Sequence, residues 1–212
     1  MKIVWHGHSC FEIRNEKTII TDPHDGKSIG IQPPRTKADI ILISHDHYDH
    51  NASRVIRGDH IDLMAQEGLF SIKGIEIEGL RTFHDESDGR KRGINTIYRF
   101  RIDDMKFCHM GDLGHTLDDR ILKQIGKVDV LFIPVGGVTT INADQAKVLI
   151  EKIGPRIAVP MHYRITGLGL VLDGLDNFLR GIPEEKIYRV GNEIDFTHDD
   201  IADDMEYWVF SM

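Results

Sequence analysis

A short run of histidines and aspartates in the first quarter of the chain constrains the fold and the chemistry more than any other feature. Residues 40–43 (IILI) are apolar and mostly β-branched, which predicts a buried strand. The residues that follow carry His45, His47, Asp49 and His50. Side chains two residues apart diverge on a helix, whereas at a strand end or in a turn they project the same way. Imidazole and carboxylate groups suit zinc, iron, manganese or nickel, so the run predicts a metal site just after a strand.

Metal-capable residues also follow other apolar runs along the chain. They are Asp22 after residues 18–21, His84 after 79–83, Gly111-Asp112 after 107–110 and His162 after 157–161. Sheets of α/β proteins usually place their functional sites at the carboxyl ends of strands. We therefore expect these residues to meet the run at 45–50 along one edge of a sheet.

The remaining sequence pattern predicts a single domain of mixed α/β class. Asn142 and Gln145 have the spacing of a capping box at the start of a helix that Gly154 ends. Shorter helices are expected at 118–125 and 175–180, and further strands at 18–21, 107–110, 128–133 and 157–159. Alternating polar and apolar residues predict half-exposed strands at 72–77 and 97–102. No repeat or interdomain linker interrupts the chain, so we expect one domain over residues 1–212.

Composition narrows the class of protein. With 41% hydrophobic and 28% charged residues among 212, the chain has ordinary globular usage. Its net charge of −8 argues against nucleic acid as a partner, because phosphate-binding proteins are normally basic. Two cysteines are too few for a disulfide-stapled secreted scaffold. With no signal-peptide pattern and no apolar run of about 20 residues, we expect a cytoplasmic protein without a membrane partner.

The metal-capable residues, taken together, resemble the metallo-β-lactamase superfamily. Its signature is His-x-His-x-Asp-His after an apolar strand, and the other markers occur here in the family's order. The opening Trp5-His6-Gly7-His8-Ser9 and the segment Pro134-Val135-Gly136-Gly137 are similar to a branch of small hydrolases that includes L-ascorbate-6-phosphate lactonase. The resemblance covers about residues 1–196 and implies a four-layer αββα sandwich with a dinuclear metal site on one edge.

The resemblance also implies a role for each residue of the site. The first metal would be held by His45, His47 and His84, the second by Asp49, His50 and His162, and Asp112 would bridge them. Asp22 would orient this ligand set from behind it. The implied enzyme is a hydrolase with two divalent ions, zinc first and manganese, iron or nickel as alternatives. Asp49 and Asp112 would be its catalytic carboxylates, and a metal-bridging hydroxide would attack a small anionic ester, lactone or phosphorylated metabolite.

Several other residues are candidates for roles around the site. His115 is expected to support the ligands, and Arg164, Thr140 and His24 to contact substrate. His6 and His8 form a second His-x-His pair that could suggest another metal site. They are expected to lie in the first strand, with a structural or ligand-supporting role favoured over direct ligation. The charged stretch 84–93 is interpreted either as a solvated loop or as a rim that contacts an anionic substrate.

Two other functions remain open from the sequence. One is a phosphodiesterase or nuclease that uses the same dinuclear site, which the acidic net charge argues against. The other is a diiron redox protein or a non-catalytic metal-binding scaffold, and the complete ligand set argues against the scaffold. Residues 199–212 form a C-terminal extension beyond the resemblance, and its Tyr-Trp-Val-Phe run at 207–210 is too apolar to remain in water. We expect that run to dock on its own domain or in a homo-oligomer interface.

Overall fold

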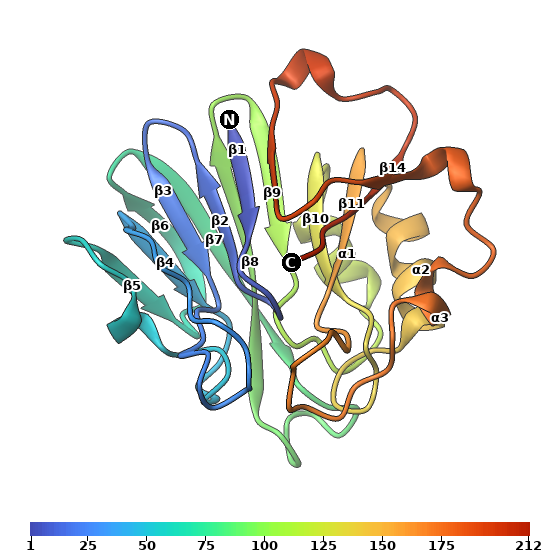
Figure 1. The fold of residues 1–212 in the computed structure, drawn as a ribbon, viewed down its shortest axis with the longest axis horizontal. Coiled ribbons are helices and arrows are strands. Elements are labelled where there is room, and N and C mark those ends of the chain that lie inside the picture. Colours follow the sequence, from blue (N-terminus) through green and yellow to red (C-terminus); the bar gives the residue numbers. More distant parts are fainter.

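The computed structural model describes residues 1–212 and is built around two β-sheets that face each other (Figure 1). The first sheet has six strands in the order β13-β1-β2-β3-β4-β5. Its strands are β1 (Lys2–Trp5), β2 (Phe11–Arg14), β3 (Thr18–Thr21), β4 (Ile40–Ile43), β5 (Ile61–Met64) and β13 (Glu193–Asp195). β3, β4 and β5 run parallel, so the residues that follow β3 and β4 emerge at the same edge.

The second sheet has eight strands in the order β12-β14-β11-β10-β9-β8-β7-β6. Its strands are β6 (Gly68–Ile72), β7 (Ile75–Phe83), β8 (Ile94–Ile102), β9 (Met105–His109), β10 (Val130–Pro134), β11 (Ile157–Met161), β12 (Ile187–Arg189) and β14 (Glu206–Val209). β9, β10 and β11 are parallel, and β6 to β9 are antiparallel. The ends of β7, β9 and β11 thereby share one edge of this sheet.

Three helices lie beside the second sheet: α1 (Asp119–Ile125), α2 (Ala143–Ile153) and α3 (Asp176–Leu179) (Figure 1). The capping box predicted at the start of α2 is confirmed, since Asn142 accepts from the Gln145 backbone and Gln145 reaches back to the Asn142 backbone. Asp118 caps α1 with a single bond, its side chain accepting from the backbone N–H of Ile121. None of the helices is long and apolar enough to cross a membrane.

The central strands β3 and β4 of the first sheet are buried on both faces, but no α-helix covers the outer face. Ile19, Ile40 and Leu42 face the main core between the sheets, whereas Ile20 and Ile41 belong to a small cluster on the other side. That cluster is closed by Ala38, Val55 and Ile56, which come from loops and the 3₁₀ turn Ser53–Val55. The expected α/β sandwich is confirmed, with a thin outermost layer on this side because the connection from β4 to β5 forms only the 3₁₀ turn Ser53–Val55 and no α-helix.

Two local predictions were wrong. Residues 72–77 are not one strand: Lys73 and Gly74, with φ of 50° and 84°, form the turn of the β6–β7 hairpin. Two successive residues in the left-handed region are typical of a tight hairpin turn. His6 and His8 lie after β1 and not within it, because β1 ends at Trp5. The second difference changes the composition of the site.

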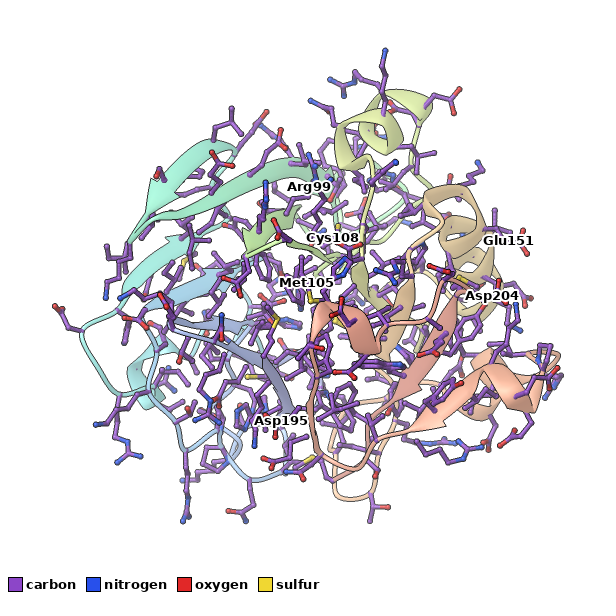
Figure 2. The ribbon with its side chains drawn as sticks, turned by 90° about the horizontal axis from the view of Figure 1, so that it is seen from above. Arg99, Met105, Cys108, Glu151, Asp195 and Asp204 are labelled. Atoms are coloured by element: carbon purple, nitrogen blue, oxygen red, sulfur yellow. The ribbon has the colours of Figure 1, made fainter.

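The C-terminal extension docks on its own domain, as one of the two alternatives predicted. β14 pairs in parallel with both β11 and β12, and the side chains of residues 207–210 are buried. Phe178 packs against Tyr207, and Phe196 packs edge-on against Trp208. Figure 2 looks down on the molecule and shows Cys108 near its middle on β9, with Asp204 of the extension toward the helical side. The tail therefore completes the second sheet.

Candidate metal centre

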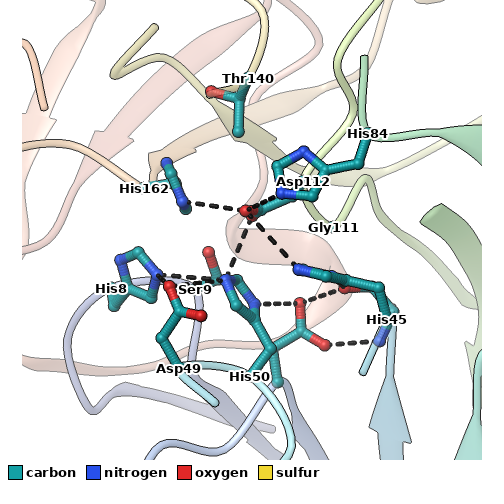
Figure 3. A network of polar contacts seen from close by, with 12 residues as sticks. His8, Ser9, His45, Asp49, His50, His84, Gly111, Asp112, Thr140 and His162 are labelled. Atoms are coloured by element: carbon teal, nitrogen blue, oxygen red, sulfur yellow. Dashed lines mark hydrogen bonds and ion pairs between the residues drawn. The ribbon is translucent and has the colours of Figure 1, made fainter. Parts of the chain in front are cut away.

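All seven residues predicted as metal ligands come together where the strands of both sheets end. His45, His47, Asp49 and His50 follow β4, His84 follows β7, Asp112 follows β9 and His162 follows β11. Figure 3 shows the imidazole and carboxylate groups of six of them, all but His47, turned toward one another. The convergence follows from the parallel strands, which deliver their carboxyl ends to the same place.

The candidate ligand atoms form two separate groups, and a third cluster of Asp22, His45 and His50 shares one member with each. His45, His47 and His84 form one, and His8, Asp49, His50 and His162 form the other; within each group all ligand atoms lie within 4.8 Å of one another. The division matches the one implied by the resemblance, with one addition. His8 joins the second group.

Asp112 lies between the two groups. Its Oδ2 is 3.2 Å from His84 Nε2 and 3.0 Å from His162 Nε2. Its Oδ1 is 3.4 Å from His50 Nε2. One carboxylate thus faces an imidazole of each group, as a bridging ligand must.

The donor set fits divalent metal ions. Ser44 Oγ donates to Asp22 Oδ2 at 2.7 Å, so it must accept the proton of His45 Nδ1 at 2.8 Å. This tautomer leaves the lone pair on His45 Nε2, a buried atom with no hydrogen-bond partner. A buried nitrogen without a partner is costly unless a ligand satisfies it, and a metal ion is the ligand that such a donor set selects.

Asp22 lies behind the candidate ligands and is hydrogen-bonded to Ser44 and His50. It is fully buried and accepts from the backbone N–H of Ser44 at 2.7 Å and from His50 Nδ1 at 3.0 Å. The bond from His50 directs Nε2 of the same ring at Asp112 and Asp49. One carboxylate therefore orients His50 directly and His45 through Ser44.

Asn95 is a supporting residue that the sequence analysis missed. It is fully buried on β8, where Oδ1 accepts from the backbone N–H of Asp112 at 2.9 Å. Nδ2 donates to Thr82 Oγ1 at 2.8 Å and to the Met110 carbonyl at 2.9 Å. An asparagine in an alternating strand gives no sequence signal, so only the register of β8 against β7 and β9 reveals its role.

Gly111 allows Asp112 to approach the rest of the site. Its φ is 56°, in the left-handed region that favours glycine. A Cβ at this position would lie 2.3 Å from Asn95 Oδ1 and 2.4 Å from Ser44 Cβ. The backbone before Asp112 is thus packed directly on the two residues that orient the ligands.

At neutral pH His8, His45 and Asp112 are in the protonation states that bind metal, whereas His50 is not. Burial lowers the pKa of His8 to about 3 and that of His45 to about 3, so both rings are neutral. Burial would raise the pKa of Asp112, but His162 and His50 hold it well below its usual range. His50 is the exception: burial lowers its pKa, yet Asp112 and Asp49 raise it well above the ordinary value. Metal binding there must release a proton.

A pocket of about 370 Å³ opens over the cluster. Its lining residues are His47, Tyr48, Asp49, His84, Arg92, Asp112, Val138, Thr139, His162, Leu170, Val171 and Leu172. Tyr48, Val138 and Val171 are 56%, 64% and 82% exposed, so an apolar rim surrounds the polar floor.

The predicted substrate contacts do not lie where the sequence placed them. Arg164 is exposed and does not line the pocket; His162, in the left-handed region with φ of 53°, redirects the chain before it. His24 is fully buried and donates Nε2 to the His6 carbonyl at 2.9 Å. Thr140 donates its hydroxyl to the Ile141 carbonyl at 3.2 Å. The pocket is lined instead by the neighbour of Thr140, Thr139, and by Arg92.

Asp85 shapes the loop that carries Arg92. Its carboxylate accepts four backbone N–H groups, from Ser87, Gly89, Lys91 and Arg92, at 2.7–3.1 Å. Ordered by these bonds, the charged stretch at 84–93 delivers one arginine to the pocket, which favours the interpretation as a rim.

His115 holds the start of that loop. The Phe83 backbone N–H donates to His115 Nε2 at 3.1 Å, and His115 Nδ1 donates to the Thr116 carbonyl at 2.8 Å. The ring thus fixes Phe83, the residue just before His84.

Comparison with known proteins identifies the family. A family described as "Beta-lactamase superfamily domain" matches residues 2–162. The chain belongs to the metallo-β-lactamase superfamily. It is 32% identical to a UPF0173 metal-dependent hydrolase of Thermoplasma acidophilum, over 77% of this chain and 83% of that protein. It is 30% identical to a UPF0173 protein of Pyrococcus abyssi, over 89% of this chain and 93% of that protein.

The solved structures agree with this assignment. A superfamily protein of Thermotoga maritima, described as a candidate zinc-dependent hydrolase, superimposes with a TM-score of 0.83 at 33% identity. The match covers 99% of this chain and 97% of that one. As a member of the superfamily with these relatives, the protein is a metal-dependent hydrolase. The similarities do not single out the ascorbate-6-phosphate lactonase branch.

Proposed function

We propose that the protein is a dinuclear hydrolase, with zinc as the first candidate metal, that cleaves small anionic esters, lactones or phosphorylated metabolites. One ion would be held by His45, His47 and His84, and the other by the group that contains Asp49, His50 and His162. The observation that carries the proposal is the position of Asp112, whose Oδ2 lies 3.2 Å from His84 Nε2 and 3.0 Å from His162 Nε2.

When bound, divalent ions lower the pKa of water to about 7 and polarise a carbonyl or phosphoryl oxygen. The chain itself contributes an ionised carboxylate, Asp49, next to the proposed metal site. Burial would raise the pKa of Asp49, but His50 and a hydrogen bond from His8 bring it far below its usual range. Asp49 lines the pocket, so it can accept a hydrogen bond from the attacking water and orient it.

Arg92 supports the choice of an anionic substrate. It is the only arginine or lysine that lines the pocket, and its guanidinium is always charged. The apolar rim of Tyr48, Val138 and Val171 can hold the uncharged part of the substrate. Two free, buried cysteines are compatible with the reducing cytoplasm that we propose as its location.

The test is metal analysis combined with a substrate panel. Protein purified without chelator should contain about two equivalents of metal, and it should hydrolyse members of a panel of lactones, carboxylic esters, phosphomonoesters and thioesters in preference to phosphodiesters. Asp112→Ala should remove the activity. A fully loaded protein with one metal would refute the dinuclear site, and hydrolysis of phosphodiesters alone would favour the nuclease alternative.

A pair of loop variants tests the substrate charge. Arg92→Ala should raise KM for an anionic substrate and leave KM for its neutral analogue unchanged. Lys91→Ala is the matched control, because Lys91 is exposed in the same loop and does not line the pocket. Equal KM changes in both variants would refute the role of Arg92.

A further inference from the structure

We propose that His8 is an additional metal ligand, belonging to the group of Asp49, His50 and His162. The inference rests on the proposed metal site and adds to it a residue outside the superfamily's His-x-His-x-Asp-His run. His8 is fully buried, and its Nε2 lies 3.2 Å from His50 Nε2 and 3.3 Å from Asp49 Oδ2 (Figure 3).

The contact between the two rings indicates a shared cation. His50 Nδ1 donates to Asp22, so its Nε2 is the atom available to a metal. His8 Nε2 lies 3.2 Å from His50 Nε2, and Asp49 Oδ2 lies beside His8. One divalent ion between these three atoms could bind all of them. His162 completes the group, since its ring centroid is 4.3 Å from that of His8.

The backbone at His8 is held in an unfavourable conformation. Its φ is 55°, in the left-handed region, and Gly7 before it has a φ of 90°. Non-glycine residues in this region cost free energy and persist where the surroundings enforce them, often at functional sites. The ligand His162 has the same feature, with a φ of 53°.

Several contacts enforce the conformation. The His8 carbonyl accepts from Trp5 Nε1 at 3.1 Å and from the backbone N–H of His162 at 3.3 Å. Ser9, the next residue, accepts from His109 Nε2 at 3.1 Å. The loop after β1 is therefore bonded directly to His162 and to His109, the last residue of β9, and these bonds hold His8 in place.

The additional ligand makes the two metal sites unequal. With His8, the second group offers four residues of its own, whereas the first group offers three, and Asp112 is shared. A site with more protein ligands has fewer positions left for water or substrate. The second site should therefore hold its metal more tightly, and the first should be the more open one.

Metal binding by three variants tests the inference without any substrate. In His8→Ala and in His8→Gln, affinity for one of the two equivalents of Zn²⁺, measured by competition with a chelator, should fall at least about tenfold. Loss of a merely orienting partner already costs 10–100-fold. The visible spectrum of the Co²⁺-loaded protein should change in both. His6→Ala is the matched control, because His6 lies in the same loop, pairs with Glu12 and belongs to neither ligand group.

Two results would overturn the inference. One is wild-type affinity and an unchanged Co²⁺ spectrum in His8→Ala. The other is weakened binding in His8→Ala that His8→Gln restores, which would show that His8 only positions Asp49 by a hydrogen bond.

The wild-type protein gives a check that does not depend on the variants folding. Ring N–H signals of Co²⁺-bound histidines are strongly shifted in the proton NMR spectrum, and six should be present with His8 bound. Five would contradict ligation by His8. A protein that shows six signals and hydrolyses nothing in the panel would support the inference while refuting the proposed function.

Discussion

Replacing Asn95 with alanine should destabilise the protein and weaken its metal site together. The side chain makes three hydrogen bonds of 2.8–2.9 Å in a fully buried position. Alanine leaves the Asp112 N–H and the Met110 carbonyl without this partner. The third partner, Thr82, still donates its hydroxyl to the backbone carbonyl of residue 95, which the substitution does not remove.

The expected magnitude follows from those two groups. A buried polar group left without a partner costs about 1–3 kcal/mol, so two give roughly 2–6 kcal/mol. A water molecule in the vacated space would recover part of this cost, and we expect about 3 kcal/mol. For a domain of this size the melting temperature falls roughly 2–4 °C per kcal/mol, which predicts a decrease of about 6–12 °C.

Urea unfolding of the metal-free protein measures this cost without a contribution from bound metal. Asn15→Ala is the control, because Asn15 bonds to Asp103 on the surface and its loss should cost less than about 0.5 kcal/mol. Chelator competition on the loaded protein should show a 10–100-fold loss of affinity, since Asp112 loses the bond that orients it. A change below about 1 kcal/mol with unchanged metal affinity would refute the role assigned to Asn95.

Three further results are expected. Asp112→Ala should lower the metal content more completely than Asp22→Ala, because Asp112 faces both ligand groups while Asp22 only orients them; equal losses in elemental analysis would contradict the assignment. Truncation after Asp200 removes β14, which buries several hundred Å² of aromatic surface and contributes several kcal/mol to stability. Thermal unfolding followed by circular dichroism should therefore lose its cooperativity or have a much lower midpoint. An unchanged unfolding curve would show that β14 is dispensable. At Asp85, burial raises the pKa but bonds from four backbone N–H groups outweigh it, so the pKa is lowered. The ionised Asp85 therefore stabilises the folded protein above the unfolded pKa of about 3.9, and this stabilisation is lost as the pH falls through the lower folded pKa. In Asp85→Asn the melting temperature should depend less on pH in that window than in the wild type. Parallel curves of melting temperature against pH for the two proteins would refute this.

The local pattern of the chain, together with the family resemblance it carries, was enough to name seven of the residues that gather at the candidate metal centre. The run at 45–50 follows an apolar strand, and Asp112 and His162 follow two more, so each could be found from residues within a few positions of it. The capping box at Asn142 and Gln145 was equally local and is confirmed.

Long-range pairing decided what the pattern could not. His8 meets His50 across 42 positions, and Asn95 meets Asp112 across 17, because sheet order and strand register bring them together. No local period encodes those distances, so His8 was assigned to a strand and Asn95 was missed.

Backbone conformation determines which side chains line the pocket over the candidate metal centre. Arg164 was chosen for its closeness in sequence to His162, but His162 takes a left-handed φ that a non-glycine residue gives no reason to expect. Arg92 reaches the pocket because Asp85 folds its loop through four backbone bonds. The sequence by itself determined which chemistry the chain carries and at which strand ends, since both depend on neighbouring residues. Only the tertiary structure decided which side chains complete the site, since that depends on contacts between residues far apart in the chain.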